Sequence, residues 1–256
     1  KVGIVSLLRL DRLILDGTEV GDGLLASWLP VLALSTIALG TIGALAARRL
    51  SGIAANLVII SSGTLIFAVS DGSEDAIAAL LFYLPHSTLA TAGLFLLAGA
   101  IARARGEAGD CLVRAPLPHD RVSLGIAFAI LAVALSGLPP LGGFLGKLML
   151  LQGAGSGALR AFWWGTVLLS GLIVALVLAR AASLLFWEPS EPPAGPRVSA
   201  PLLPIALLCL ISPAFAAAAV PIAAWSDSVA RQLAAPVPMV EAVIGNSRPV
   251  ERERRP

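Results

Sequence analysis

Two titratable side chains lie inside long apolar stretches, where a charge is costly in lipid. Lys147 lies in SGLPPLGGFLGKLMLLQG, and His86 lies in FYLPHSTLATAGLFLLAG. A buried amine takes up or releases a proton in response to neighbouring charge, and an imidazole exchanges protons near neutral pH. These residue types predict proton transfer within a membrane, with no residue assigned to covalent catalysis.

An interruption of the helix is expected just before Lys147. Pro139 and Pro140 lack backbone donors, while Gly142 and Gly143 make irregular backbone less costly. Unpaired backbone groups are unfavourable in lipid, so the break is expected to face protein or water. Two interpretations remain open. The segment is either a discontinuous transporter helix or a proline kink tolerated for packing.

Lys147 has two alternative placements. The expected span ends near Gln152, so the ammonium is close enough to the interface to reach it by snorkelling. In the other placement it points into the helix bundle beside the break and passes protons. The second placement gives the residue a functional role.

His86 is expected near the membrane midplane, next to Pro85. Ser87, Thr88 and Thr91 supply hydroxyl groups that can hold water along a hydrated path. The alternative is a histidine that only hydrogen-bonds a hydroxyl group between packed helices. Both interpretations place the imidazole inside the bundle.

Lys1 opens the apolar stretch KVGIVSLLRL. The chain is expected to begin part-way along an outward-running helix, which makes Lys1 a second intramembrane lysine. The six full spans that the sequence predicts contain no Asp or Glu, so a carboxylate that binds a cation must come from elsewhere in the protein or from a partner subunit. Cys111 and Cys209 occur in different settings and suggest neither a disulfide nor a metal site.

The composition defines the elements that must hold these residues. Of 256 residues, 57% are hydrophobic and only 13% are charged, which excludes a soluble domain of this size. Several stretches reach the ~20 apolar residues that a membrane-spanning helix needs, and the alternation of a barrel strand is missing. The net charge is +2 and the basic residues are scattered, so no nucleic-acid partner is expected.

The sequence therefore predicts an all-α polytopic membrane protein with about six full transmembrane helices, a partial one and one discontinuous helix. The full spans are expected at 25–47, 51–69, 77–101, 122–152, 161–186 and 201–223, and the partial one at 1–14. Four regions follow: the end of a truncated helix at 1–14, a helical core at 25–152, two further helices within 153–223, and a polar, disordered tail at 224–256.

Arginine is distributed unevenly among the connections. The links after the spans 25–47, 77–101 and 161–186 are rich in Arg, whereas the alternate links carry most of the acidic residues. The positive-inside rule makes the Arg-rich links cytoplasmic. The span that begins near residue 25 then runs inward.

Four stretches in this order resemble a known family. They are KVGIVSLLRL, GALAARRLSGIAANLVIISSGTL, LFYLPHSTLATAGLFLLAGAIAR and LSGLPPLGGFLGKLMLLQGA. They are similar to the proton-translocating antiporter-like subunits shared by respiratory complex I and Mrp-type Na+/H+ antiporters, most of all to the D subunit of the Mrp-type complexes. The resemblance runs from residue 1 to about residue 190.

The resemblance implies the C-terminal half of a fourteen-helix subunit with two inverted repeats, each with one broken helix. It places Lys1, His86 and Lys147 on a central hydrophilic axis, with Lys147 as the terminal lysine of the proton path. The family's acidic residue and partner lysine of the first repeat have no counterpart in this chain.

The implied function is proton translocation in a multisubunit monovalent cation antiporter of the bacterial inner membrane, with Na+ as the expected cation and no cofactor. Its implied partners are other membrane subunits and the lipid bilayer. Two alternatives remain: a proton-pumping subunit of a complex I type NADH-quinone oxidoreductase, or a structural subunit without transport.

Overall fold

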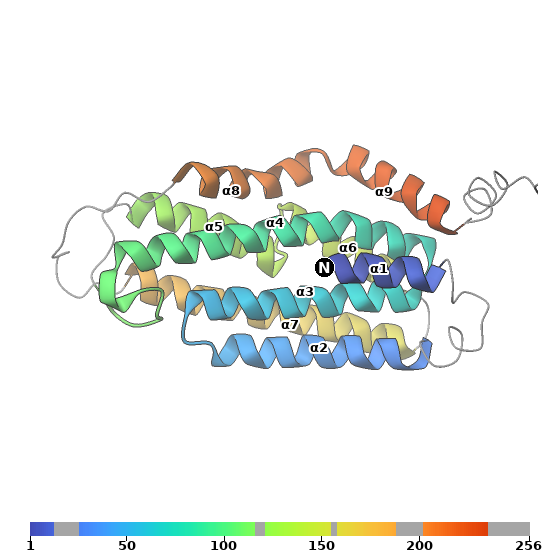
Figure 1. Cartoon of the computed structure of the whole chain (residues 1–256), viewed down its shortest axis with the longest axis horizontal. Coiled ribbons are helices and arrows are strands. Elements are labelled where there is room, and N and C mark those ends of the chain that lie inside the picture. Colours follow the sequence, from blue (N-terminus) through green and yellow to red (C-terminus); the bar gives the residue numbers. More distant parts are fainter. Residues whose placement is uncertain (13–25, 116–120, 155–157, 188–201, 235–256) are drawn as a thin grey trace, which may run out of the picture.

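The computed structural model describes residues 1–12, 26–115, 121–154, 158–187 and 202–234. Within these ranges every regular element is a helix (Figure 1). The α-helices are α1 (Val2–Leu10), α2 (Ala26–Ala46), α3 (Leu50–Asp71), α4 (Glu74–Ala104), α5 (Arg121–Ser136), α6 (Gly142–Gly153), α7 (Ala158–Ala182), α8 (Leu202–Ala217) and α9 (Ala219–Ala234). A short 3₁₀ turn, Gly106–Ala108, follows α4, and a π-helical turn, Ser183–Trp187, extends α7. The prediction of an all-α membrane protein is confirmed.

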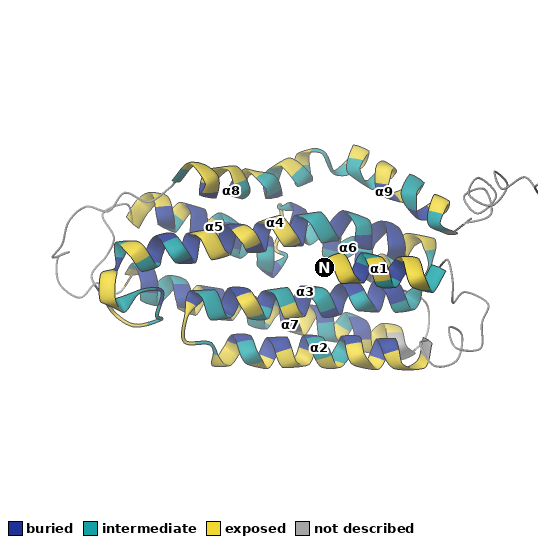
Figure 2. Ribbon diagram, in the orientation of Figure 1, coloured by how far each residue is buried: buried dark blue, intermediate teal, exposed yellow. Residues whose placement is uncertain are grey.

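Helix α4 is the centre of the bundle. It packs against α3, α5, α6, α8 and α9, and it is the longest helix in the described part of the chain, with 31 residues. Small buried residues along it, including Ala90, Gly93 and Ala98, let its neighbours approach closely. Figure 2 shows dark blue buried positions along α3 and α4, with yellow exposed positions more frequent on α2 and α8. Any side chain on the inner face of α4 is therefore enclosed by several helices.

Four helices are long and apolar enough to cross a bilayer: Ser27–Ala46, Leu50–Asp71, Glu74–Ala104 and Arg160–Trp187. They agree closely with the spans expected at 25–47, 51–69, 77–101 and 161–186. Large apolar side chains on α2 and α7 remain exposed, among them Leu39, Ile42, Leu169, Leu172 and Leu176. An exposed apolar surface of this kind suits contact with lipid or with neighbouring subunits.

The span predicted at 201–223 is not one straight helix. Helix α8 ends at Ala217, and α9 begins at Ala219 with a change of direction of 79°. Pro221 explains the interruption, because it has no N–H group for the carbonyl of Ala217 and is tolerated in the first turn of the next helix. The bent pair can count as a fifth span, in addition to the four straight ones.

The predicted disordered tail is wrong in its first part. Residues 224–234 belong to α9, where Ala230 is buried and Leu233 packs against the cluster formed by α1, α3 and α4. Burial of this apolar face stabilises the helix. The polar residues of 224–234 had instead favoured a disordered segment. The remainder of the predicted tail, 235–256, lies outside the described residues.

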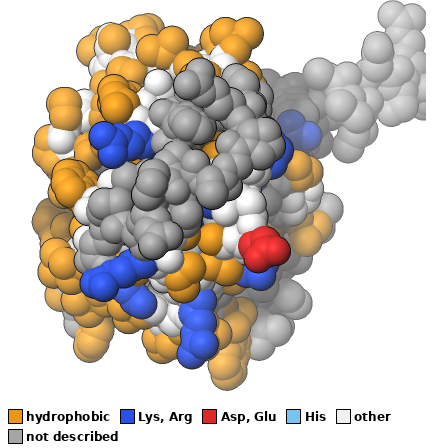
Figure 3. All heavy atoms as spheres, turned by 90° about the vertical axis from the view of Figure 1, so that its left-hand side faces the viewer, with side chains coloured by type: hydrophobic (Ala, Val, Ile, Leu, Met, Phe, Trp, Pro, Cys, Tyr) orange, Lys and Arg blue, Asp and Glu red, His pale blue; other side chains and the backbone are white. Residues whose placement is uncertain are grey.

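One end of the bundle is rich in arginine. Figure 3 views this end and shows blue Lys and Arg side chains at several places, with little red. Arg105, in the connection after α4, donates hydrogen bonds to the carbonyl oxygens of Cys111 at 2.7 Å and Val113 at 2.5 Å. Asp110 accepts hydrogen bonds from the N–H and hydroxyl of Ser51, at 2.9 and 2.5 Å. These contacts fasten the connection to the start of α3.

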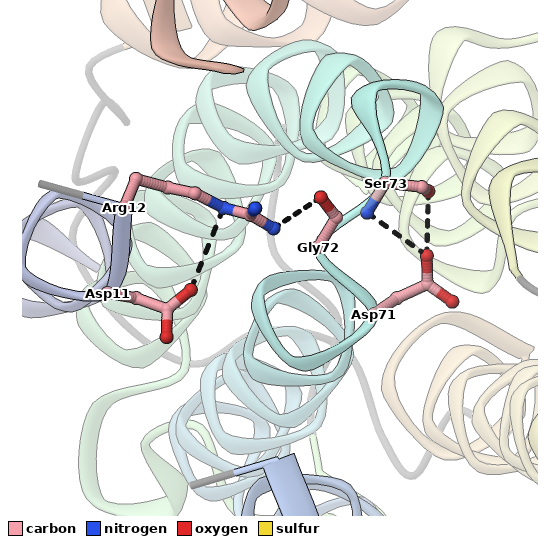
Figure 4. Close-up of polar contacts among 5 residues, drawn as sticks. All are labelled: Asp11, Arg12, Asp71, Gly72 and Ser73. Carbon is pink, nitrogen blue, oxygen red and sulfur yellow. Dashed lines mark hydrogen bonds and ion pairs between the residues drawn. The ribbon is translucent and has the colours of Figure 1, made fainter. Parts of the chain in front are cut away.

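The opposite end joins α1, α3, α4 and α6 through short polar contacts (Figure 4). Arg12 donates to the carbonyl of Gly72 and lies 3.6 Å from the carboxylate of Asp11. The hydroxyl of Ser73 caps α4 by accepting from the N–H of Ala76, at 3.1 Å. The same hydroxyl lies 2.6 Å from an Asp71 carboxylate oxygen and 3.1 Å from the carbonyl of Gly153, the last residue of α6.

Candidate functional site

The expected helix break is present at residues 137–141, between α5 and α6. Gly137 has φ 79°, a left-handed conformation that favours glycine. The Pro139–Pro140 peptide bond is cis. Leu138, Pro139 and Pro140 are exposed on the surface of the described chain, whereas Ser136 is buried. The break is thus enclosed on one side only, and the exposed side consists of residues with few backbone donors to satisfy.

Glycines bring the backbone of α6 directly against its neighbours. A Cβ atom on Gly142 would lie 2.7 Å from Cβ of Phe215, and one on Gly143 would lie 3.0 Å from Cε1 of His86. A Cβ atom on Gly146 would lie 2.9 Å from the ring of Tyr83. The LGGFLG sequence is therefore needed for close packing of α6 on α4 as well as for the break.

Lys147 points back toward the break. Its ammonium donates to the carbonyl oxygen of Ser136 at 2.8 Å and approaches that of Leu135 at 3.4 Å. These carbonyls lie at the C-terminal end of α5, where a helix dipole favours positive charge. The side chain bends into the chain instead of extending toward the end of α6, so this geometry differs from the snorkelling placement.

A pocket of about 350 Å³ borders the same ammonium, between the break and α7. Lys147, Ser136 and Gly137 line it from the break, and Trp164 and Gly171 line it from α7. The other lining residues are apolar. The pocket therefore places a largely apolar space beside the ammonium, with the polar groups confined to the side of the break.

His86 is 1% exposed and lies in the middle of α4. Its Nε2 atom forms a hydrogen bond of 2.9 Å with the hydroxyl of Ser212 on α8, and the rings of Tyr83 and Phe215 lie nearby, with centroids 6.5 and 5.7 Å away. The Nδ1 atom is buried and has no hydrogen-bond partner among the described residues. The alternative of a histidine satisfied by a hydroxyl thus accounts for only one ring nitrogen.

Lys1 reaches the same region from α1. Its ammonium donates a hydrogen bond of 2.7 Å to the hydroxyl of Ser87, the residue that follows His86. Thr91 is also buried and donates to the carbonyl of Ser87 at 2.6 Å. Thr88 faces outward and is exposed, so the structure does not bring it together with the other two hydroxyl residues.

The structure thus gathers Lys1, Ser87 and His86 at one place and sets Lys147 at the adjacent break, separated from His86 by the backbone of α6. The chain contains two lysines in all, and both belong to this arrangement. Within the described ranges no group of three or more His, Cys, Asp or Glu residues is arranged to hold a metal ion. The geometry is that of separated proton-binding groups in a bundle interior.

Sequence reasoning missed four contributors to this site. Ser212 is the hydrogen-bond partner of His86, and Phe215 packs on its ring. The carbonyls of Leu135 and Ser136 are the partners of Lys147. Ser212 is the sole hydroxyl residue in the apolar sequence of α8, a signal that marks it for attention without identifying its partner.

The family of the chain is identified by its similarity to known proteins. The family described as "NADH:quinone oxidoreductase/Mrp antiporter, TM" matches residues 1–174, a range that contains Lys1, His86, Lys147 and the whole break. The chain belongs to this family. Its fold and its membership support a multi-pass membrane protein of the antiporter-like type.

Two similar proteins are antiporter subunits by name. The chain is 32% identical to the D subunit of a probable K(+)/H(+) antiporter of Rhizobium meliloti, over 97% of this chain and 51% of that protein. It is 30% identical to the D subunit of the Na(+)/H(+) antiporter of Bacillus subtilis, over 95% of this chain and 49% of that protein. The chain spans about half the length of these curated relatives.

Solved structures agree on the fold. A chain of the Mrp complex from Dietzia sp. superposes with a TM-score of 0.80 at 21% identity, over 95% of this chain and 53% of that one. A chain of respiratory complex I from Thermus thermophilus gives a TM-score of 0.71 at 25% identity, over 91% of this chain and 49% of that one. The helix arrangement is therefore shared by antiporter and complex I membrane subunits.

Proposed function

We propose that this chain is the C-terminal, proton-translocating half of the D subunit in a multisubunit monovalent cation/proton antiporter of the bacterial inner membrane. The names of the Rhizobium and Bacillus relatives support the antiporter assignment. They name K+ and Na+ respectively, and we propose Na+ as the transported cation. The proposed partners are the other membrane subunits of the complex.

The contact of Lys147 with the open end of α5 carries the proposal. An ammonium in lipid needs compensation, and here two backbone carbonyls at the C-terminus of a broken helix provide it. Because these carbonyls carry only partial charge, they stabilise the cation less than a carboxylate would, and a proton bound there can leave. A lysine paired with a buried Asp or Glu would hold its proton more firmly.

The proton path runs along Lys1, Ser87, His86 and Lys147. The first step uses the hydrogen bond between Lys1 and Ser87, whose hydroxyl can both accept and donate. His86 follows directly in the chain. No hydrogen bond joins His86 to Lys147 in the described structure, so we propose that water completes this step across the backbone of Gly142 and Gly143. Inward proton flow along this path drives the cation outward.

The test is cation/proton exchange by the complete complex in everted membrane vesicles, followed with a pH-sensitive dye. We expect Lys147→Ala to lower the exchange rate at least about tenfold, since a proton carrier is lost from the path. Arg180→Ala on α7 is the matched control, because Arg180 is an exposed cation and makes no contact with the site. Exchange at the normal rate with Lys147→Ala, in fully assembled complex, would contradict the proposal.

The similarity to complex I favours one second candidate, a proton-pumping subunit that is powered by quinone reduction elsewhere in the assembly. The same residues would form the path, and catalysis would belong to other subunits. Purification of the intact assembly distinguishes the two. Flavin and iron-sulfur subunits that co-purify with this chain would favour the redox pump, and a complex of membrane subunits alone would favour the antiporter.

A further inference from the structure

Helix α8 lies outside the stretch that the family match covers, yet it reaches the centre of the site. The match ends at residue 174, and α8 spans Leu202–Ala217. Ser212 of this helix is 1% exposed and forms the hydrogen bond of 2.9 Å to Nε2 of His86. A neighbouring side chain, Phe215, contacts the same ring edge-on at 5.7 Å between centroids.

The backbone of α6 fixes α8 at this distance. A Cβ atom on Gly142 would lie 2.7 Å from Cβ of Phe215 and 3.1 Å from the carbonyl oxygen of Ser212. The absence of a side chain on Gly142 thus allows α8 to lie against both α6 and His86. Ser212 occupies a defined position, and its hydroxyl has no backbone partner in the described structure that competes with the imidazole.

The hydrogen bond that one ring nitrogen of a histidine makes decides which nitrogen carries or exchanges the proton. The hydroxyl of Ser212 can donate to Nε2 or accept from it, so it supports the ring in either protonation state. The other nitrogen, Nδ1, is buried and unpartnered among the described residues, which leaves it as the atom that receives or releases the proton through water. Both lysines of the chain lie in this region, Lys1 at the hydroxyl of Ser87 and Lys147 at the adjacent break.

We infer that Ser212 is a positioning residue for proton transfer, which holds Nε2 of His86 and so directs proton exchange to Nδ1. This inference rests on the proposed function and adds to it a residue from a helix that the family match leaves out. Ser212 acts through His86 and does not itself carry the transported proton.

The experiment uses the complete complex in vesicles and five variants, one of them His86→Ala alone. Ser212→Ala removes the hydroxyl and is expected to lower exchange about three- to tenfold, the size of effect that loss of one hydrogen bond gives. Ser212→Thr keeps a hydroxyl and is expected to retain most of the exchange. Cys209→Ala is the matched control, because Cys209 is buried one turn earlier on α8 and contacts the carbonyl of Ala127 instead of His86. It is expected to leave exchange unchanged.

The fourth variant, the double change His86→Ala with Ser212→Ala, separates a positioning role from a packing role. If Ser212 acts through His86, the double variant is no slower than His86→Ala alone. A further loss in the double variant overturns the inference, as does normal exchange with Ser212→Ala or a loss with Cys209→Ala as large as that with Ser212→Ala. Normal exchange with His86→Ala overturns the proposed path itself, together with the inference that depends on it.

Discussion

The ammonium nitrogen of Lys147 lies 2.8 Å from the carbonyl oxygen of Ser136. In an uninterrupted α-helix that oxygen would accept from the N–H of residue 140, and the oxygen of Leu135 would accept from residue 139. Both positions are proline, which has no N–H. Pro139 and Pro140 therefore leave unpaired the same two carbonyls that Lys147 contacts. The prolines within the break and Lys147 on α6 beyond it therefore bear on the same two carbonyls.

Restoring the missing donors should weaken the contact with Lys147. The double change Pro139→Ala and Pro140→Ala supplies two N–H groups that can pair with the carbonyls of Leu135 and Ser136. We expect cation/proton exchange in vesicles to fall at least about fivefold, because backbone bonds then compete with the ammonium. Pro30→Ala in α2 is the control, since that proline lies inside a helix that contributes no residue to the pocket beside Lys147. Unchanged exchange in the double variant would show that the prolines do not act through these carbonyls.

Gly137→Ala should destabilise the protein and displace Lys147. The residue has φ 79°, where a side chain costs roughly 1–2 kcal/mol, and its Cβ would lie 2.6 Å from Cδ of Lys147. We expect a lower melting temperature of the purified complex and reduced exchange. Gly165→Ala is the matched control, because nothing lies within 4 Å of its Cβ position on α7. Equal melting temperatures for the two variants would argue against the strained conformation at Gly137.

Two adjacent hydroxyl residues on α4 provide a direct comparison. Ser87→Ala removes the partner of the Lys1 ammonium, whereas Thr88→Val changes an exposed side chain that bonds only to the carbonyl of Leu84. We expect Ser87→Ala to lower exchange by about ten- to a hundredfold, as loss of a hydrogen bond to a charged group gives. Thr88→Val is expected to exchange normally. Similar rates in the two variants would remove Ser87 from the path.

Ser73→Ala tests the joint between α4 and α6. The change removes the N-cap of α4 and the contact with the carbonyl of Gly153. Loss of such a cap costs about 1 kcal/mol, so we expect a lower melting temperature with little change in exchange at moderate temperature. The control is Ser6→Ala, whose exposed hydroxyl bonds only to the carbonyl of Val2. A melting temperature equal to that of Ser6→Ala would indicate that Ser73 does not stabilise this end of the bundle.

Much of the fold could be predicted from the sequence, because an apolar stretch of about 20 residues is typical of a membrane-spanning helix. The spans of α2, α3, α4 and α7 were predicted within a few residues, and the break at 137–141 was expected from its prolines and glycines. The bend between α8 and α9 was missed because one additional proline, Pro221, lies in a sequence that is otherwise uniformly apolar. Hydropathy measures composition and carries little information on helix direction.

The site was less accessible from the sequence than the fold. Lys1, His86 and Lys147 stand out because charge is rare in such stretches, but their partners do not. Lys147 contacts the backbone carbonyls of Leu135 and Ser136. Because every residue type has such a carbonyl, the sequence does not indicate this role. The pairing of His86 with Ser212 joins residues 126 positions apart, a contact that depends on the packing of α8.

The one-sided enclosure of the break has a mechanical consequence. One side of the break is exposed and consists of Leu138, Pro139 and Pro140. On the other side, the ammonium of Lys147 donates a hydrogen bond to the carbonyl of Ser136. When the amine of Lys147 loses its proton, its hydrogen bonds to the two carbonyls weaken, and water becomes the stronger hydrogen-bond donor available to them. We therefore expect the break to be most hydrated while Lys147 is neutral.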